Sequence, residues 1–153
     1  MPTISVSIET PLQPDVTALL QQSDSVAARL YPGEYRRPID AGFLAKPGTD
    51  VLVARRKGLA LGMCVLFNRG DCTIELKRMI VDSAARGMGI GWALVEAAEV
   101  RARALDAETM LLEVGVRNVE AQQLYQRAGF EPCPAFAPYH ASPISLFMRL
   151  SLV

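Results

Sequence analysis

Three glycines at alternate positions precede a helical pattern at the centre of the chain, in the segment RGMGIGWALVEAAE (86–99). Glycine loses more backbone entropy on folding than any other residue, so this spacing indicates a loop that needs unusual backbone angles or a close approach to a ligand. Apolar residues then recur at Leu94, Ala98, Ala102 and Leu105, the spacing of one helix face. The chain therefore turns from a loop into a helix at a point where backbone N–H groups can bind an anion.

Strand-like segments lie on both sides of this loop and predict a mixed sheet. Residues 50–56, 58–68 and 72–81 are rich in apolar residues and are separated by short polar turns, which indicates an antiparallel meander. A helix at 92–105 and a strand at 109–116 follow the loop. Because a strand–helix–strand unit crosses over right-handed, the strands before and after this helix should be parallel.

The two ends of the chain add further elements. We expect a strand at 3–9, a helix at 15–30 that is interrupted near 23–25, and a short helix at 39–44. A second helix at 119–128 follows Asn118, and Pro132 and Pro134 weaken the strand FEPCPAF (130–136) before a closing strand at 144–152. The predicted fold is α/β, with a mixed, mostly antiparallel sheet between helices, in a single domain spanning residues 1–153.

The composition argues against several classes of function. Sixteen Lys and Arg balance 16 Asp and Glu, so no general basic field favours nucleic acid. No apolar run approaches the ~20 residues needed to span a bilayer, and the N-terminal segment lacks the features of a signal peptide. Three scattered cysteines and one histidine do not make a zinc site. We expect a cytoplasmic protein without a metal, nucleic-acid or membrane partner.

The glycine spacing alone leaves several alternatives for the loop. A phosphate-binding P-loop requires GxxxxGK[ST], and no Lys follows these glycines. A dinucleotide-binding loop requires GxGxxG directly after a strand, whereas Gly87, Gly89 and Gly91 form GxGxG some distance after Val81. In a third alternative the loop amides bind a pyrophosphate, with Arg86 at the entrance. A glycine-rich turn without a ligand is the fourth.

A second motif favours the pyrophosphate site. RGMGIG (86–91) resembles the R/Q-x-x-G-x-G/A signature of the GCN5-related N-acetyltransferases, the GNAT superfamily. NVEAQQLYQRAGF (118–130) is similar to the N-x-x-A-x-x-L-Y-x-x-x-G-F element of that family, in the family's order and at its separation. The resemblance covers residues 72–130, and ELKRMIV (75–81) is similar to a subgroup of small bacterial acetyltransferases with indoleacetate-related members. The N-terminal third matches only in the order of elements.

The resemblance implies acetyl-CoA as the donor and a GNAT-like acyl-CoA N-acyltransferase fold. The pantetheine arm would pair like an added strand with the backbone of Met79, Ile80 and Val81. Asn118, which is also a candidate helix cap, would bridge the end of the next strand and the cofactor. The diphosphate would lie on the backbone amides of the glycine loop, which are those of Arg86, Gly87, Met88, Gly89, Ile90 and Gly91.

Two side chains are candidates for catalysis. The Tyr125 phenol, with a usual pKa near ~10, can protonate a leaving CoA thiolate with a pKa near ~8.5; the alternative is a core tyrosine anchored by its hydroxyl. Glu75 is the candidate general base, which would take a proton from the amine directly or through water. Without a bulge Glu75 shares a strand face with Lys77 and Met79; the alternative role is an ion pair with Lys77 or Arg55.

The acceptor is predicted only as an amine, on a small molecule or a peptide. Lys77 and Arg78 are adjacent, so they should point to opposite strand faces, and one of them in the acceptor cleft would favour an acceptor carrying a carboxylate. The resemblance implies that Arg36 and Arg37 lie where the family builds its acceptor wall. The role of the loop at 134–143, with Tyr139 and His140, stays open, and a lone histidine such as His140 is expected to be structural or exposed.

The predicted function is therefore an acetyl-CoA-dependent N-acetyltransferase that transfers the acetyl group directly to an amine. Two alternatives stay open: a non-catalytic acyl-CoA-binding regulatory module, and a dinucleotide-binding domain. A homodimer is compatible with the resemblance.

Overall fold

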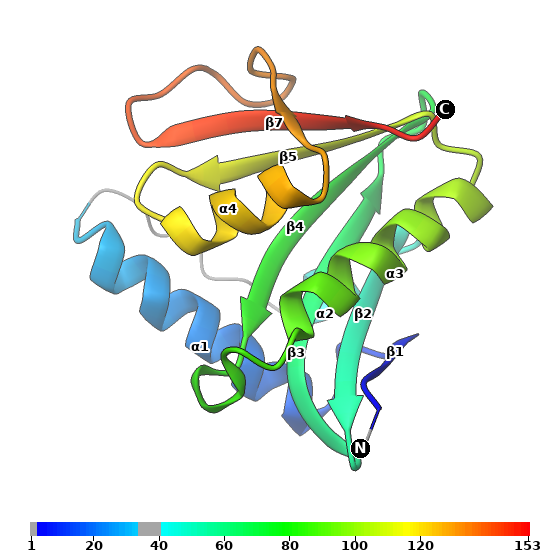
Figure 1. The fold of residues 1–153 in the computed structure, drawn as a ribbon, viewed down its shortest axis with the longest axis vertical. Coiled ribbons are helices and arrows are strands. Elements are labelled where there is room, and N and C mark those ends of the chain that lie inside the picture. Colours follow the sequence, from blue (N-terminus) through cyan, green and yellow to red (C-terminus); the bar gives the residue numbers. More distant parts are fainter. Residues whose placement is uncertain (1–2, 34–40) are drawn as a thin grey trace.

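Residues 3–33 and 41–153, the part of the chain that the computed structural model describes, build a seven-stranded sheet in the order β1-β2-β3-β4-β5-β7-β6 (Figure 1). The strands are β1 (Ser5–Ile8), β2 (Thr49–Arg56), β3 (Leu59–Asn68), β4 (Thr73–Val81), β5 (Thr109–Gly115), β6 (Glu131–Pro132) and β7 (Ser145–Ser151). The helices are α1 (Pro14–Leu30), α2 (Ala41–Leu44), α3 (Ile90–Ala104) and α4 (Val119–Arg127), with a 3-10 turn at Ser83–Ala85.

The pairing of the strands confirms the predicted mixed, mostly antiparallel sheet. Strands β4 and β5 are parallel, and the other neighbouring pairs in the described part of the chain are antiparallel. Helix α3 makes the crossover between the two parallel strands, as the strand–helix–strand pattern predicts.

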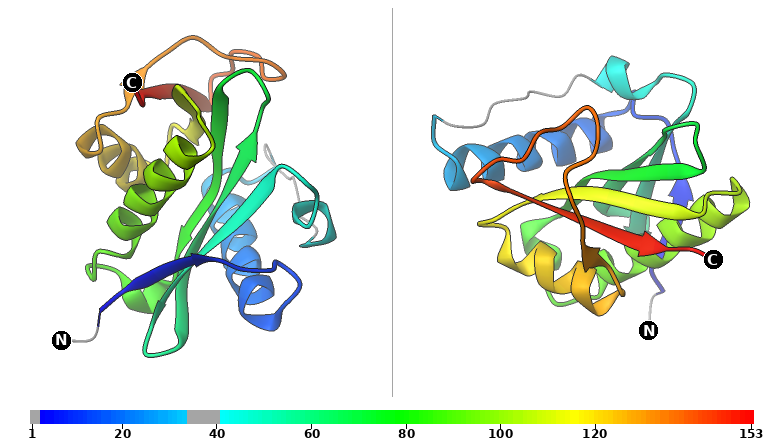
Figure 2. Two further views of the ribbon diagram at one scale, coloured as in Figure 1. Left: turned by 90° about the vertical axis from the view of Figure 1, so that its right-hand side faces the viewer. Right: turned by 90° about the horizontal axis from the view of Figure 1, so that it is seen from above.

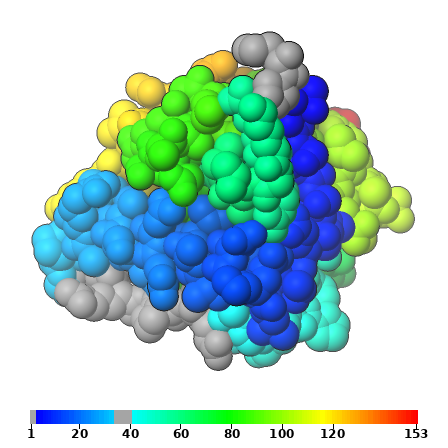
Figure 3. Space-filling view, turned by 90° about the horizontal axis from the view of Figure 1, so that it is seen from below, coloured from blue at the N-terminus to red at the C-terminus, as the bar shows by residue number. Residues whose placement is uncertain are grey.

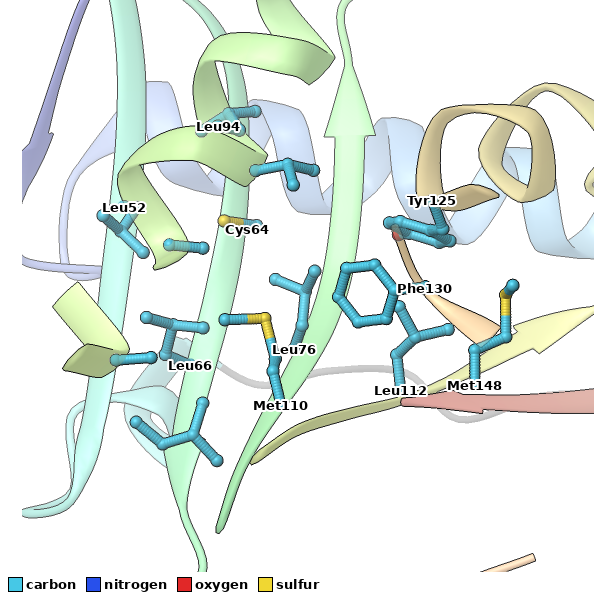
Figure 4. Packing of buried hydrophobic residues seen from close by; sticks show 14 of the residues in the cluster. Leu52, Cys64, Leu66, Leu76, Leu94, Met110, Leu112, Tyr125, Phe130 and Met148 are labelled. Carbon is cyan, nitrogen blue, oxygen red and sulfur yellow. The ribbon is translucent and has the colours of Figure 1, made fainter. Parts of the chain in front are cut away.

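Helices cover both faces of this sheet (Figure 2). Successive side chains of a strand point to opposite faces, so Val51 and Val53 of β2 pack in the cluster under α1. Leu52 and Ala54 of the same strand pack in the larger cluster under α3 and α4, part of which is drawn in Figure 4. This two-sided burial explains why the central strands are apolar on both faces rather than alternating with polar residues.

Helix α1 differs from its prediction. The expected interruption near residues 23–25 is wrong, because the helix runs unbroken from Pro14 to Leu30. The Ser25 hydroxyl donates to the Gln21 carbonyl at 3.0 Å, so this polar side chain is satisfied within the helix. The helix lies beside the turn that follows β4 (Figure 3), where Gln22 donates to the Asp82 carboxylate at 3.1 Å.

Strands β4 and β5 pair only at one end, and this opens the sheet. Thr73–Leu76 pairs with Thr109–Leu112, and the two strands do not pair beyond that point. In β4 the register with β3 also shifts, because Val65 faces Lys77 whereas Met63 faces Ile80. The extra residue forms a bulge that includes Arg78, whose φ is 53°.

The bulge reverses which side chains of β4 point to each face of the sheet. Before it, Leu76 packs under α3, and after it Met79 packs in the same cluster while Ile80 packs against the cluster under α1. The regular alternation that would place Glu75 and Met79 on one face is therefore broken.

Candidate active site

A cavity of about 590 Å³ lies where β4 and β5 diverge. Its walls come from α1, α2, β4, β5, α4 and the loop before β7. The cavity brings together five of the predicted site residues: Glu75, Met79, Ile80, Asn118 and Tyr125. Val81 and residues 86–91 are not among the residues that line it. The predicted donor-loop site and catalytic site are therefore neighbouring regions rather than one pocket.

The glycine loop has the backbone that its sequence requires. Gly87 and Gly89 have φ values of 79° and 80°, in the left-handed region that favours glycine. At Gly91 a Cβ would instead lie 3.0 Å from Cδ2 of Leu124, so a small residue lets α3 pack closely on α4. Within the described part of the chain, the N–H groups of Gly89, Ile90 and Gly91 donate no hydrogen bond to a backbone or side-chain acceptor. The start of α3 therefore offers several free donors to an anion.

Arg86 lies at the entrance of this loop, and a carboxylate already contacts it. Its Nη1 donates to Oε1 of Glu120, in the first turn of α4, at 2.9 Å. Both side chains are more than half exposed, so this ion pair contributes little to stability. The guanidinium can therefore exchange Glu120 for a ligand anion at small cost.

Asn118 is the N-cap residue of α4, as its place in the sequence predicts, but its side chain makes no capping hydrogen bond to that helix. Its Oδ1 accepts a hydrogen bond from the Tyr31 hydroxyl at 2.9 Å. The Tyr31 oxygen in turn accepts from the Arg117 backbone N–H at 2.9 Å, so the phenol proton must point to Asn118. This assignment leaves the Asn118 amide nitrogen as a donor beside the cavity that Asn118 lines.

Tyr125 is buried in α4 and lines the cavity. Its ring packs against Phe130, with 5.6 Å between the ring centroids (Figure 4). Its hydroxyl makes no hydrogen bond to the residues described, so the alternative of a tyrosine anchored by its hydroxyl does not hold there. Burial raises the pKa of Tyr125 above its usual value, which keeps the phenol protonated and able to donate.

Glu75 is buried, with 4% of its side chain exposed, and its partners differ from those expected. The Tyr139 hydroxyl donates to its Oε2 at 2.6 Å, and Nη1 of Arg69 lies 3.8 Å from its Oε1. The alternative of an ion pair with Lys77 or Arg55 is not formed among the described residues, where Arg69 lies near Glu75 and Arg55 pairs with two carboxylates near the N-terminus. Tyr139 reaches Glu75 across 64 positions in the sequence, so local spacing could not reveal this contact.

Aromatic rings fix the loop that carries Tyr139. Phe136 lies edge-on to both Tyr139 and Phe147, with ring centroids 5.4 Å apart in each pair. The Arg69 guanidinium lies 5.0 Å from the centroid of Phe136. The loop at 134–143 is therefore anchored by its aromatic rings, and His140 within it is exposed, as expected of a lone histidine.

Lys77 and Arg78 line the same cavity, contrary to the expectation of opposite faces. The bulge removes the alternation on which that expectation depended. Arg78 forms an ion pair with Asp24 of α1 at 3.3 Å, and Nζ of Lys77 lies 5.9 Å from the centroid of the Tyr139 ring. Arg36 and Arg37 lie outside the described residues.

Residues 3–33 and 41–153 show no feature of a metal site or of a membrane-spanning helix. No cluster of three or more His, Cys, Asp or Glu side chains there is arranged to hold a metal ion. None of the helices in these ranges is long and apolar enough to cross a membrane.

The model of the acetyltransferase (GNAT) family matches residues 15–130. The chain belongs to the GNAT acetyltransferase family. It is 39% identical over 153 residues to the IAA acetyltransferase of Azospirillum brasilense, covering 99% of this chain and 100% of that protein.

Solved GNAT structures share the fold over the whole chain. A Klebsiella pneumoniae protein assigned to the acyl-CoA N-acyltransferases has a TM-score of 0.84 and 28% identity, covering 99% of both chains. A Bacillus subtilis acetyltransferase in complex with CoA has a TM-score of 0.72 and 17% identity, covering 99% of this chain and 100% of that one. The latter likeness concerns the fold alone.

The geometry of this GNAT chain fits an extended donor that carries an anion. The diverging strands leave backbone groups of β4 unpaired with β5, and the start of α3 supplies free N–H groups. A doubly wound parallel sheet, which a dinucleotide-binding domain requires, is not what the described residues build.

Proposed function

We propose that this protein transfers the acetyl group of acetyl-CoA directly to an amine that binds in the cavity between β4 and β5. The observation that carries the proposal is that two buried side chains able to exchange protons, the phenol of Tyr125 and the carboxyl group of Glu75, line this one cavity. They come from different elements, α4 and β4, and the family supplies the reaction class.

The donor would bind along β4 and the start of α3. Backbone groups of Met79, Ile80 and Val81 lie after the point where β5 diverges, where an extended ligand can pair with them. The diphosphate would accept hydrogen bonds from the N–H groups of residues 86–91 and would attract the Arg86 guanidinium. The Asn118 amide would donate from the opposite side of the opening.

The proposed chemistry needs two proton movements. As the amine nitrogen bonds to the acetyl carbon, its surplus proton passes to Glu75, directly, through water or through the Tyr139 hydroxyl that contacts Glu75. As the carbon–sulfur bond breaks, the Tyr125 hydroxyl gives its proton to the leaving sulfur. Acetyl-CoA supplies the activated acyl group, and the side chains supply the base and the acid.

A thiol-release assay with acetyl-CoA and a panel of amines tests this proposal. Release that depends on an amine supports an enzyme, whereas CoA binding without release from any amine supports the alternative of a non-catalytic regulatory module. Thermal stabilisation by NAD(H) and none by CoA would instead support a dinucleotide-binding role. Because the Azospirillum brasilense relative is an IAA acetyltransferase, IAA is tested in the same assay.

The remaining expectations are parts of the same proposal. We expect the 153 residues to act as one domain, in the cytoplasm, without a nucleic-acid or membrane partner. Sedimentation equilibrium would test the homodimer.

A further inference from the structure

Lys77 is a half-buried cation beside the cavity, and it is not neutralised by contact within the described part of the chain. Among the described residues its ammonium makes no ion pair or hydrogen bond, and it lies 5.9 Å from the centroid of the Tyr139 ring. A buried or half-buried ammonium costs free energy unless it is paired, so its position favours an anionic ligand.

The other charged groups that line the cavity have partners of their own. Arg78 pairs with Asp24 at 3.3 Å, and Glu75 contacts Tyr139 and Arg69. Glu113 accepts a hydrogen bond from the Ser145 hydroxyl at 2.8 Å. Among the described residues that line the cavity, Lys77 is thus the cation that no carboxylate contacts.

The donor does not account for this cation. Its diphosphate is assigned to residues 86–91, and none of these residues lines the cavity. Apolar side chains of Val26, Phe43 and Ile144 line the cavity as well, so it also has room for an apolar group. An acceptor that suits all these features carries an amine, an anionic group and an apolar body.

We infer that the acceptor is an amine of the α-amino acid type and that Lys77 binds its carboxylate. This inference rests on the proposed function and names its acceptor class. The amine lies toward Glu75, which takes its proton, while the carboxylate lies toward the Lys77 ammonium. Glu113 adds a second negative charge that favours the ammonium form of an approaching amine.

The experiment compares matched acceptors with the 153-residue chain as the enzyme. Leucine, methionine and phenylalanine are each tested against the corresponding amide and the corresponding decarboxylated amine, at equal concentrations of free base. The wild-type kcat/KM should favour the carboxylate form by about 10- to 100-fold, the size of one hydrogen-bonded charge pair. Lys77→Met should reduce that preference to within about threefold, and Lys77→Arg should retain most of it.

Two controls separate the outcomes. Lys57→Met changes an exposed lysine in the turn between β2 and β3 and should keep the wild-type preference. The CoA dissociation constant and the melting temperature check that each variant keeps its donor site and its fold. Amides or plain amines accepted as well as the amino acids, or an unchanged preference in Lys77→Met, would overturn the inference and leave the proposed function standing. No transfer to any amine would overturn both.

Discussion

Gly115→Ala should destabilise the protein strongly, although it adds a single methyl group at the end of β5. A Cβ at this position would lie 1.9 Å from the Tyr31 hydroxyl oxygen, 2.6 Å from its Cζ and 2.9 Å from Oδ1 of Asn118. The phenol must therefore move away by at least about 1 Å before the methyl group fits.

The magnitude follows from what that movement breaks. Tyr31 would lose its hydrogen bonds to Asn118 and Arg117, both 2.9 Å long, at about 1 kcal/mol each. Overpacking adds about 1–3 kcal/mol. The lower entropy of the unfolded alanine chain returns roughly 0.4–1 kcal/mol. The net loss is about 2–5 kcal/mol, or a melting temperature lower by roughly 4–18 °C in a chain of this size.

Calorimetry and urea unfolding measure this loss, and Gly91→Ala provides the control. Gly91 lies in α3, and its new Cβ would meet the flexible end of Leu124 at 3.0 Å while alanine favours the helix by about 1 kcal/mol. Its stability should stay at or above that of the wild type. Tyr31→Phe removes the hydroxyl, so Gly115→Ala should cost less in that background. A melting temperature of Gly115→Ala within about 2 °C of the wild type, or strictly additive losses, would refute the reasoning.

Three further predictions concern the loop, the acid and the buried thiol. Gly89→Val should abolish CoA binding in calorimetric titrations, because a branched side chain at φ 80° is strained and covers the loop amides. The control Gly58→Val, at φ 79° in a distant turn, should bind CoA normally. CoA affinity that is retained in Gly89→Val would count against the diphosphate site. Tyr125→Phe should lower kcat by ~10²–10⁴ with little change in melting temperature, since its hydroxyl makes no hydrogen bond to the described residues; an unchanged rate and pH–rate profile would reject its role as the acid. Burial raises the pKa of the Cys64 thiol to about 12, so the folded state keeps a proton that the unfolded chain loses near ~8.5. The stability that this difference contributes is complete below about pH 8.5 and is lost as the pH rises toward 12. Over that interval the free energy of unfolding should therefore fall less steeply with pH in Cys64→Ala than in the wild type. Equal slopes in the two proteins would show that the thiol is not the cause.

The sequence predicts those parts of the fold that local patterns determine. Alternating apolar residues and short turns predict the meander, and the helix between two strands predicts the parallel β4–β5 pair. The alternate glycines predict the loop, because Gly87 and Gly89 adopt backbone angles that other residues rarely adopt.

The parts that local patterns miss depend on contacts between distant residues. The bulge in β4 is centred on Arg78, a residue type that does not indicate positive φ, and it changes which side chains face the cavity. Asn118 has the sequence context of a helix cap, but its side-chain oxygen accepts a hydrogen bond from Tyr31, 87 positions away. Tyr139, 64 positions from Glu75, reaches it in the same way, through tertiary packing that spacing does not encode.

The proposed reaction transfers the acetyl group of acetyl-CoA to an amine in this cavity. The most direct test is quantitative mass spectrometry of reactions that contain acetyl-CoA and the amine panel, with free thiol measured in parallel. The account predicts one amine acetylated once for every thiol released, with both products depending on Tyr125. Thiol release without an acetylated amine, or tight CoA binding with neither product, would contradict it.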